Sequence, residues 1–284
     1  MRELPRVPLV QLPTPIHRLD RMSGDLGIEL WIKRDDLTGF ALGGNKGRKL
    51  EYLMADAISK GAQMMVSCGS SQSNFIRQLG AACSVLGLRC SAALMDLPYE
   101  DARPEGIPLE RESGNVRLNR ALGVEMHFMP DGTWDELYSA AEELALEHER
   151  AGLKVYRVPV GGSSPLGAYG FAAAVYELAG QAGPFDAVVV ASSSGSTQVG
   201  LAAGLYDSPT KVIGIACDPE PGLTSDFAAL SQGLSELADL PALGPKDFRL
   251  VLDYVGPGYG VPSVEGRAAA TELARREGIF LDPI

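Results

Sequence analysis

The stretch GGNKGRKLEYLM, residues 43–54, joins a glycine-rich turn directly to an amphipathic helical pattern. If the helix begins at Lys46, one face carries apolar residues at the i+4, i+7, i+8 and i+11 positions, which are Leu50, Leu53, Met54 and Ala57. Lys46 therefore begins the apolar stripe of this helix. We expect its side chain to be buried with the stripe rather than exposed with the charged face.

Lys46 is placed where a lysine amine becomes easier to deprotonate. The positive end of the helix dipole and burial both disfavour the ammonium form, so we expect its pKa to fall below the ordinary value of about 10.4. A neutral amine can form a covalent bond with an aldehyde. The alternative is a lysine that lies along the helix end and keeps its charge in water.

The other cations of the stretch are expected on the solvated side of the helix. Arg48 and Glu51 are three residues apart and can form an ion pair there, while Lys49 is expected to be solvated. A nucleotide-binding P-loop is excluded, because Asn45 follows Gly44 where that motif needs lysine, and no serine or threonine follows Lys46.

The composition excludes several other classes of protein. The 284 residues carry a formal net charge of −11, which argues against a nucleic-acid-binding surface. The four cysteines and three histidines lack the spacing of a metal site, so we expect reduced thiols and no metal. There is no signal-peptide pattern and no apolar run of membrane-spanning length. We expect a cytoplasmic protein that binds neither membrane nor nucleic acid.

Short apolar runs alternate with helical patterns along the chain, which predicts an α/β protein with two open, twisted, mostly parallel sheets and helices on both faces. Segments 159–170 and 183–186 are the best candidates for domain boundaries. The predicted strands are 29–34, 63–68, 90–95, 124–129, 154–159, 186–191, 211–216 and 249–254. The clearest helical patterns after the first stretch are 72–86, 134–150, 166–180, 196–206 and 262–277.

Two strand-to-helix turns are unusually polar. The first contains Ser70, Ser71, Gln72, Ser73 and Asn74, which exceeds what helix capping alone requires and suits a carboxylate at a helix N-terminus. The second, SSSGST at 192–197, follows the apolar run VVVA and suits a phosphate monoester, with Gly195 allowing close approach of the backbone. The alternative for each turn is an ordinary serine-rich connection.

The three features together suggest pyridoxal 5′-phosphate. Its aldehyde would react with Lys46, its phosphate would lie at residues 192–197, and the carboxylate of an amino-acid substrate would lie at residues 70–74. A sugar-phosphate or nucleotide-binding protein that uses only residues 192–197 is the alternative from another class.

The ordered motifs GGNKGRKLEYL, QSNFIRQLGA, VGGSSPLGAYGF, ASSSGSTQVGL and PGYGVP resemble the D-cysteine desulfhydrase/1-aminocyclopropane-1-carboxylate deaminase family. That family belongs to the tryptophan-synthase-β-like, fold type II enzymes that use pyridoxal phosphate. The resemblance runs from about Leu12 to the last residue. It implies a large cofactor-binding domain of residues 1–47 and 160–284, a small domain of residues 48–159, and a homodimer.

The resemblance also implies roles for individual residues. Lys46 would be the Schiff-base lysine, and Asn74 would lie beside the cofactor's O3′ oxygen. Ser73 and Tyr259 would be catalytic. Phosphate contacts would come from Ser194, Gly195, Ser196 and Thr197, and the substrate would be bound by Ser70, Gln72, Ser73, Asn74 and Tyr259.

The implied reaction is β-elimination on a small amino acid, with D-cysteine giving pyruvate, hydrogen sulfide and ammonia. Gly258 favours the desulfhydrases, whereas residues 196–198 resemble the deaminases, and Phe75 stands where the family has His or Gln. Family members also continue beyond the LDPI element at 281–284, so part of the large domain is expected to be lacking here. The alternatives are the cyclopropane deaminase, which yields 2-oxobutyrate, a cysteate sulfo-lyase, and a catalytically impaired homologue that binds the cofactor.

Overall fold

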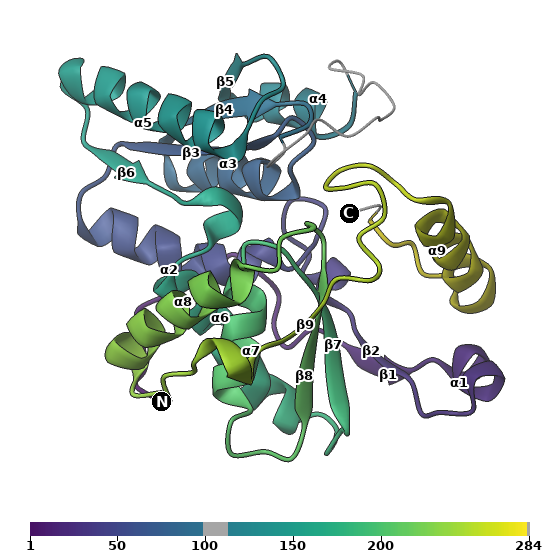
Figure 1. Ribbon diagram of the computed structural model, residues 1–284. Coiled ribbons are helices and arrows are strands. Elements are labelled where there is room, and N and C mark those ends of the chain that lie inside the picture. The colour runs from purple at the N-terminus through teal and green to yellow at the C-terminus, as the bar shows by residue number, and fades with distance from the viewer. Residues whose placement is uncertain (99–112, 283–284) are drawn as a thin grey trace.

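Two parallel β-sheets with packed helices form the computed structural model, which describes residues 1–98 and 113–282 (Figure 1). The upper sheet in Figure 1 has the strand order β5-β4-β3-β6 and the lower one β7-β8-β9. All neighbouring strands within these two sheets are parallel. The architecture is therefore the α/β fold predicted from the alternating pattern.

The four-stranded sheet consists of β3 (Met64–Ser70), β4 (Arg89–Met95), β5 (Glu125–Phe128) and β6 (Val155–Arg157). Every residue of β3 is buried, as expected for a central strand of a sheet covered on both faces. Its side chains alternate between two cores. Met64 and Val66 face α5 (Trp134–Arg150), whereas Met65 faces α2 (Lys46–Ser59) and α3 (Asn74–Leu86).

The three-stranded sheet consists of β7 (Ala187–Ser192), β8 (Lys211–Ala216) and β9 (Arg249–Val251). Val188 and Val190 of β7 pack against Phe171 and Leu201, which lie on α6 (Pro165–Ala179) and α7 (Ser196–Gly204). Helix α8 (Leu223–Ala238) packs against both of these helices. Val189 points to the opposite face of the sheet and is 64% exposed.

Helix α2 lies between the two halves of the molecule and packs closely on α6 (Figure 1). A Cβ atom on Gly170 of α6 would lie 2.5 Å from the backbone oxygen of Arg48, so only glycine permits this approach. The consecutive residues 47–54 of α2 are all buried. Because a helix so enclosed has no solvated side, charged residues on it need protein partners.

The remaining elements lie outside the two parallel sheets. Strands β1 (Ile16–Arg18) and β2 (Trp31–Lys33) pair antiparallel, and α1 (Asp20–Leu26) packs against α9 (Val264–Glu277). Helix α4 (Gly114–Ala121) contacts α3. Three short 3₁₀ turns span Asp35–Leu37, Val160–Gly162 and Pro245–Asp247. None of the helices described in the structure is long and apolar enough to cross a membrane.

All eight predicted strands are present, and the predicted bounds of 211–216 and of the helix 134–150 match the structure. The strand predicted at 249–254 is observed as β9, which ends at Val251, and the strand predicted at 29–34 is observed as the shorter β2, Trp31–Lys33. The sequence patterns did not predict β1, because three residues give no measurable alternation. The domain boundaries derived from the resemblance stay a prediction.

Candidate active site

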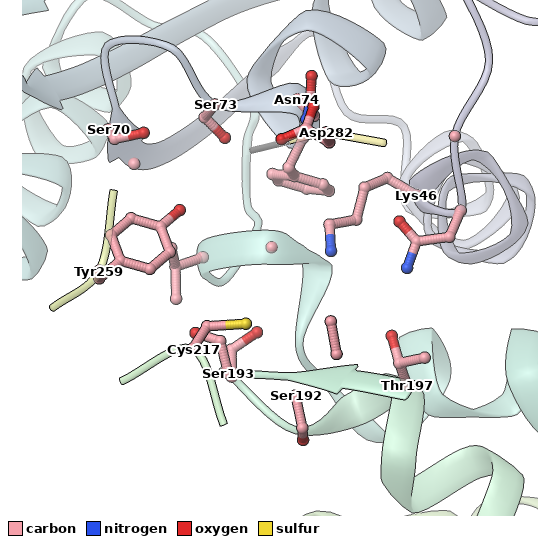
Figure 2. Close-up of a pocket in the computed structure, with 18 of the residues that line it drawn as sticks. Lys46, Ser70, Ser73, Asn74, Ser192, Ser193, Thr197, Cys217, Tyr259 and Asp282 are labelled. Atoms are coloured by element: carbon pink, nitrogen blue, oxygen red, sulfur yellow. The ribbon is translucent and has the colours of Figure 1, made fainter. Parts of the chain in front are cut away.

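A cavity of about 620 Å³ opens at the carboxyl ends of β3, β7 and β8, where ligands of parallel sheets bind (Figure 2). Polar side chains that follow the four-stranded sheet and polar side chains that follow the three-stranded sheet both line it. Of the predicted site residues, the structure brings nine to this cavity: Lys46, Ser70, Gln72, Ser73, Asn74, Ser194, Gly195, Thr197 and Tyr259.

Lys46 is the first residue of α2, as predicted, and its amine points into the middle of the cavity (Figure 2). Burial lowers the pKa of Lys46 below its ordinary value, and this effect outweighs the opposing charges of Cys217 and Asp282. The direction agrees with the expectation from the sequence. Lys46 therefore loses its proton more easily than an exposed lysine does.

The turn before Lys46 is held in one conformation. Gly43 has a φ of +77°, and a Cβ atom there would lie 1.8 Å from the backbone oxygen of Asp36. The carbonyl oxygen of Gly43 accepts hydrogen bonds of 3.1 Å from Arg77 and 2.8 Å from Gln78. Helix α3 therefore determines where α2 begins and hence where Lys46 lies.

The expectation that Arg48 and Lys49 are solvated is wrong. The side chain of Arg48 is 2% exposed and bonds to Asp35 and Glu177 rather than to Glu51. Glu51 is also buried and accepts from Arg6 and from the backbone of the N-terminal segment. The reason is the packing of α6 on α2, which removes the solvated side that the helical pattern implied.

Lys49 is a cavity residue that sequence reasoning assigned to solvent. It is 1% exposed, and its amine donates to the carbonyl oxygen of Gly161 at 3.2 Å. Burial, followed by the charge of Lys46, lowers its pKa well below the ordinary value. A Cβ atom on Gly161 would lie 2.9 Å from the Ser194 hydroxyl, so Lys49 is close to the SSSGST turn. The sequence signal that could have pointed to Lys49 as a cavity residue is its place three residues after Lys46 on the same helix.

The polar turn after β3 supplies several groups at the N-terminus of α3. Ser73 is the N-cap, and its hydroxyl accepts from the backbone N–H of Ile76 at 3.3 Å. Asn74 is the first helical residue, and its side-chain amide lies beside Asp282 (Figure 2). Ser70, at the end of β3, also faces the cavity. Ser73 therefore serves as the helix cap and lines the cavity as well.

The SSSGST turn presents the N-terminus of α7 to the cavity, as a phosphate site would. Ser196 is the exception among the predicted contacts, because it is buried away from the cavity surface and its N–H donates to the Ser163 hydroxyl at 3.1 Å. Gly195 has a φ of +90°, and a Cβ atom there would lie 2.2 Å from the Phe227 ring. Glycine is required by this packing and by the backbone conformation.

The far end of the cavity from Lys46 is aromatic. Tyr259 packs edge-on against Trp134, with ring centroids 5.4 Å apart, and Trp134 stacks on Tyr138. Burial raises the pKa of Tyr259 to about 12. Its hydroxyl is accordingly a proton donor at neutral pH. Figure 2 shows the Tyr259 ring across the cavity from the Lys46 amine.

Sequence reasoning missed Cys217 and Asp218, which follow β8 and line the cavity. The Asp218 carboxylate accepts a 2.5 Å hydrogen bond from the hydroxyl of Ser193. Burial raises the pKa of Asp218, and it raises that of Cys217 to about 11. The available signal was their position at the carboxyl end of a predicted parallel strand.

Comparisons with known proteins agree with this arrangement. The family described as pyridoxal-phosphate dependent enzyme matches residues 7–284. The chain belongs to that family. It is 41% identical to a D-cysteine desulfhydrase of Yersinia enterocolitica over 294 residues, covering all of this chain and 86% of the relative. A D-cysteine desulfhydrase of Klebsiella pneumoniae is 39% identical, with the same coverage.

A solved structure described as an ACC deaminase homologue superposes with a TM-score of 0.89 at 36% identity, covering 99% of this chain and 83% of that one. These findings confirm the predicted family, its fold and its cofactor. The four cysteines are free thiols. No group of three metal-ligating side chains occurs within residues 1–98 and 113–282.

The residues of the cavity fit pyridoxal phosphate. Lys46, whose pKa is lowered, suits the aldehyde. The N-terminus of α7, which faces the cavity, and the buried Lys49 suit the phosphate. The hydroxyl of Ser192, the first residue of the SSSGST turn, lines the cavity and is buried without a hydrogen-bond partner in the described structure. Unsatisfied buried donors are expected where a polar ligand binds.

Proposed function

We propose that this protein catalyses elimination of the thiol from D-cysteine, yielding hydrogen sulfide, pyruvate and ammonia. The observation that carries the proposal is the Lys46 amine, which shares one cavity with the Ser70–Asn74 turn and the N-terminus of α7. The two relatives at 41% and 39% identity support this choice of substrate.

Bound pyridoxal phosphate supplies an aldehyde for the lysine and a ring that accepts the electrons of the α-carbon. Lys46 would hold the cofactor covalently and, once released by the substrate amine, would take the α-proton on its Nζ. Loss of that proton lets the bond between Cβ and sulfur break, with the electron pair leaving on sulfur. Water then completes the conversion to pyruvate and ammonia.

The other predicted residues would bind and orient the reactants. Ser70, Gln72, Ser73 and Asn74 lie at the N-terminus of α3, where a substrate carboxylate is favoured. The Tyr259 hydroxyl, protonated at neutral pH, could donate a proton to the departing sulfur. For contacts to the phosphate we propose Ser194, Gly195 and Thr197. Ser196, whose N–H is bonded to Ser163, would contribute only as part of the first turn of α7, whose dipole favours an anion.

Lys49 extends the proposed phosphate site. Its amine reaches the Gly161 carbonyl beside Ser194, and a phosphate dianion there would favour the charged form that burial disfavours. The phosphate would then compensate the cost of burying this lysine.

The decisive experiment measures sulfide and pyruvate released from D-cysteine, together with the visible absorbance of the bound cofactor. Lys46→Ala should abolish both product release and the lysine-linked absorbance, whereas Lys60→Ala, at the exposed end of the same helix, should retain both. A purified protein that shows no such absorbance, or retains it in Lys46→Ala, would contradict the proposal.

Ring opening of 1-aminocyclopropane-1-carboxylate is the second candidate, supported by the solved deaminase homologue. That substrate has no α-proton, so the same cavity would need a nucleophile or a base that acts at the β-carbon. Parallel assays of pyruvate and 2-oxobutyrate release from D-cysteine, cysteate and the cyclopropane amino acid separate these reactions. Cofactor binding without turnover of any of them would indicate the impaired homologue.

We further propose that the chain forms a homodimer, as the family resemblance implies, and that residues 48–159 form the small domain. Light scattering of the purified protein tests the dimer. Expression of residues 48–159 alone, followed by measurement of cooperative unfolding, tests the domain boundary.

A further inference from the structure

The side-chain amide of Asn74 is held in one orientation by two donors. Its Oδ1 atom accepts 2.6 Å from a guanidinium nitrogen of Arg77 and 2.9 Å from the Nδ2 atom of Asn115. Because arginine has no acceptor, the oxygen of Asn74 must face it. The NH₂ group is thereby directed the other way, where it donates to the Asp282 carboxylate at 2.5 Å.

The orientation of Asn115 is forced by the same arginine. Arg77 donates to its Oδ1 atom at 2.8 Å, so the Nδ2 atom faces Asn74 and also donates to the backbone oxygen of Gln72 at 2.6 Å. The backbone N–H of Asn115 donates to the side chain of Gln72 at 2.8 Å. The N-terminus of α4 is therefore attached directly to the turn that carries Asn74.

Arg77 links these amides to the catalytic lysine proposed above. Arg77 is 9% exposed, and its guanidinium donates to the carbonyl oxygen of Gly43, three residues before Lys46. A buried cation with this many directed bonds is costly to move. The side chain of Arg77 therefore bonds both to the Asn74 amide, whose orientation it fixes, and to the turn that precedes α2.

We propose that Arg77 and Asn115 are positioning residues that fix Asn74 as a hydrogen-bond donor to the anionic ring oxygen of bound pyridoxal phosphate. The inference rests on the proposed function. Asn74 lines the cavity that contains the Lys46 amine, and its exposed group is a donor. In the structure this donor bonds to a carboxylate oxygen of Asp282, so the position accommodates an oxygen acceptor.

The test compares binding of pyridoxal 5′-phosphate with binding of its 3-O-methyl analogue, whose ring oxygen cannot be an anion. A hydrogen bond to a charged acceptor predicts that the wild type binds the cofactor about tenfold more tightly than the analogue. Asn74→Ala should bring this ratio to about one. Asn115→Leu, which has similar size but no donor, should reduce it to about threefold or less.

The double variant Asn74→Ala, Asn115→Leu should show the same ratio as Asn74→Ala alone, because Asn115 acts through Asn74. Arg117→Ala, an exposed residue of the same helix, is the matched control and should keep the wild-type ratio. Thermal unfolding of each variant without cofactor identifies any loss of folding, and Asn115→Ala replaces Asn115→Leu if the latter does not fold.

Three results would overturn the inference. The wild type could bind the cofactor and the analogue equally tightly, or Asn115→Leu could keep the full wild-type ratio of the two affinities. The preference for the cofactor could also survive in Asn74→Ala, which would show that it reflects only the size of the methyl group. Each of them leaves the proposed function intact, provided that the cofactor still bonds to Lys46. A wild-type protein that binds no cofactor at all would instead contradict the proposed function.

Discussion

The guanidinium of Arg48 donates two hydrogen bonds of 2.9 Å to the carboxylate of Glu177, which lies 129 residues further along the chain. It also donates two bonds of 2.8 Å to Asp35. Arg48 is two residues beyond Lys46 on α2, and Glu177 is near the end of α6. The network therefore anchors the helix that presents the candidate catalytic lysine.

Replacing Arg48 with methionine should lower the free energy of unfolding by about 3 kcal/mol, because the half-buried carboxylates of Asp35 and Glu177 would lose the buried guanidinium and only Glu177 would keep a cation, Lys33, beside it. Urea unfolding of the cofactor-free protein measures this. Arg18→Ala removes an exposed ion pair with Asp20 and should change stability by no more than about 1 kcal/mol. A similar, small effect of both substitutions would show that the network does not stabilise the fold.

Glu177 should make stability depend on pH in the acidic range. Burial alone would raise its pKa, but hydrogen bonds from Arg48 and then Lys33 lower the value from 4.5 to about 2. A lowered carboxyl pKa gives stabilisation that is complete above the unfolded pKa and is lost as pH falls from about 4.5 toward 2. The stability advantage of the wild type over Glu177→Gln should therefore shrink as pH falls below about 5.

Urea unfolding at several pH values between 7 and 3.5 measures this advantage. Glu143→Gln removes an exposed carboxylate and serves as the control, with no such trend expected relative to the wild type. An advantage over Glu177→Gln that stays constant down to pH 3.5 would contradict the assignment.

Lys49→Met should stabilise the cofactor-free protein while weakening cofactor binding. The pKa of Lys49 is lowered, so folding at pH 7 must bury an ammonium or remove its proton, and methionine avoids a cost of about 1–3 kcal/mol. Loss of a charged partner for the phosphate should raise the dissociation constant of pyridoxal phosphate at least about tenfold. Lys60→Met, whose side chain is 62% exposed, should alter neither quantity. Unchanged cofactor affinity in Lys49→Met would exclude Lys49 from the phosphate site.

Gly195→Ala should destabilise the protein by about 2–4 kcal/mol, because the new Cβ atom meets the buried Phe227 ring and the backbone has a positive φ. Gly180→Ala is the matched control. Gly180 has a φ of −79°, and its added Cβ atom would come no closer than 3.6 Å to its neighbours, so we expect a gain of about 0.4–1 kcal/mol. Melting temperatures of the two variants compare them directly, and equal values would refute the packing argument.

The family, the cofactor and much of the cavity could be predicted from the sequence, because their signals are local. An apolar strand followed by SSSGST places the α7 N-terminus at the end of β7, and the GGNK turn places Lys46 at the start of α2. Parallel strands bring such turns to one edge of the sheet without further information. Ser196 shows the limit of such local prediction. Its backbone N–H is not free to bind a phosphate, because it donates to the hydroxyl of Ser163, which lies 33 residues earlier in the chain.

The sequence by itself determined the alternation of strands and helices and the position of Lys46, since both follow from periodicity within a few residues. Only the tertiary structure decided which neighbours of Lys46 are buried. Arg48 and Lys49 look solvated on an isolated helix, but α6 covers that side, and their partners come from Asp35, Gly161 and Glu177. The orientation of the Asn74 amide was decided in the same way, because it depends on the position of Asn115, 41 residues away.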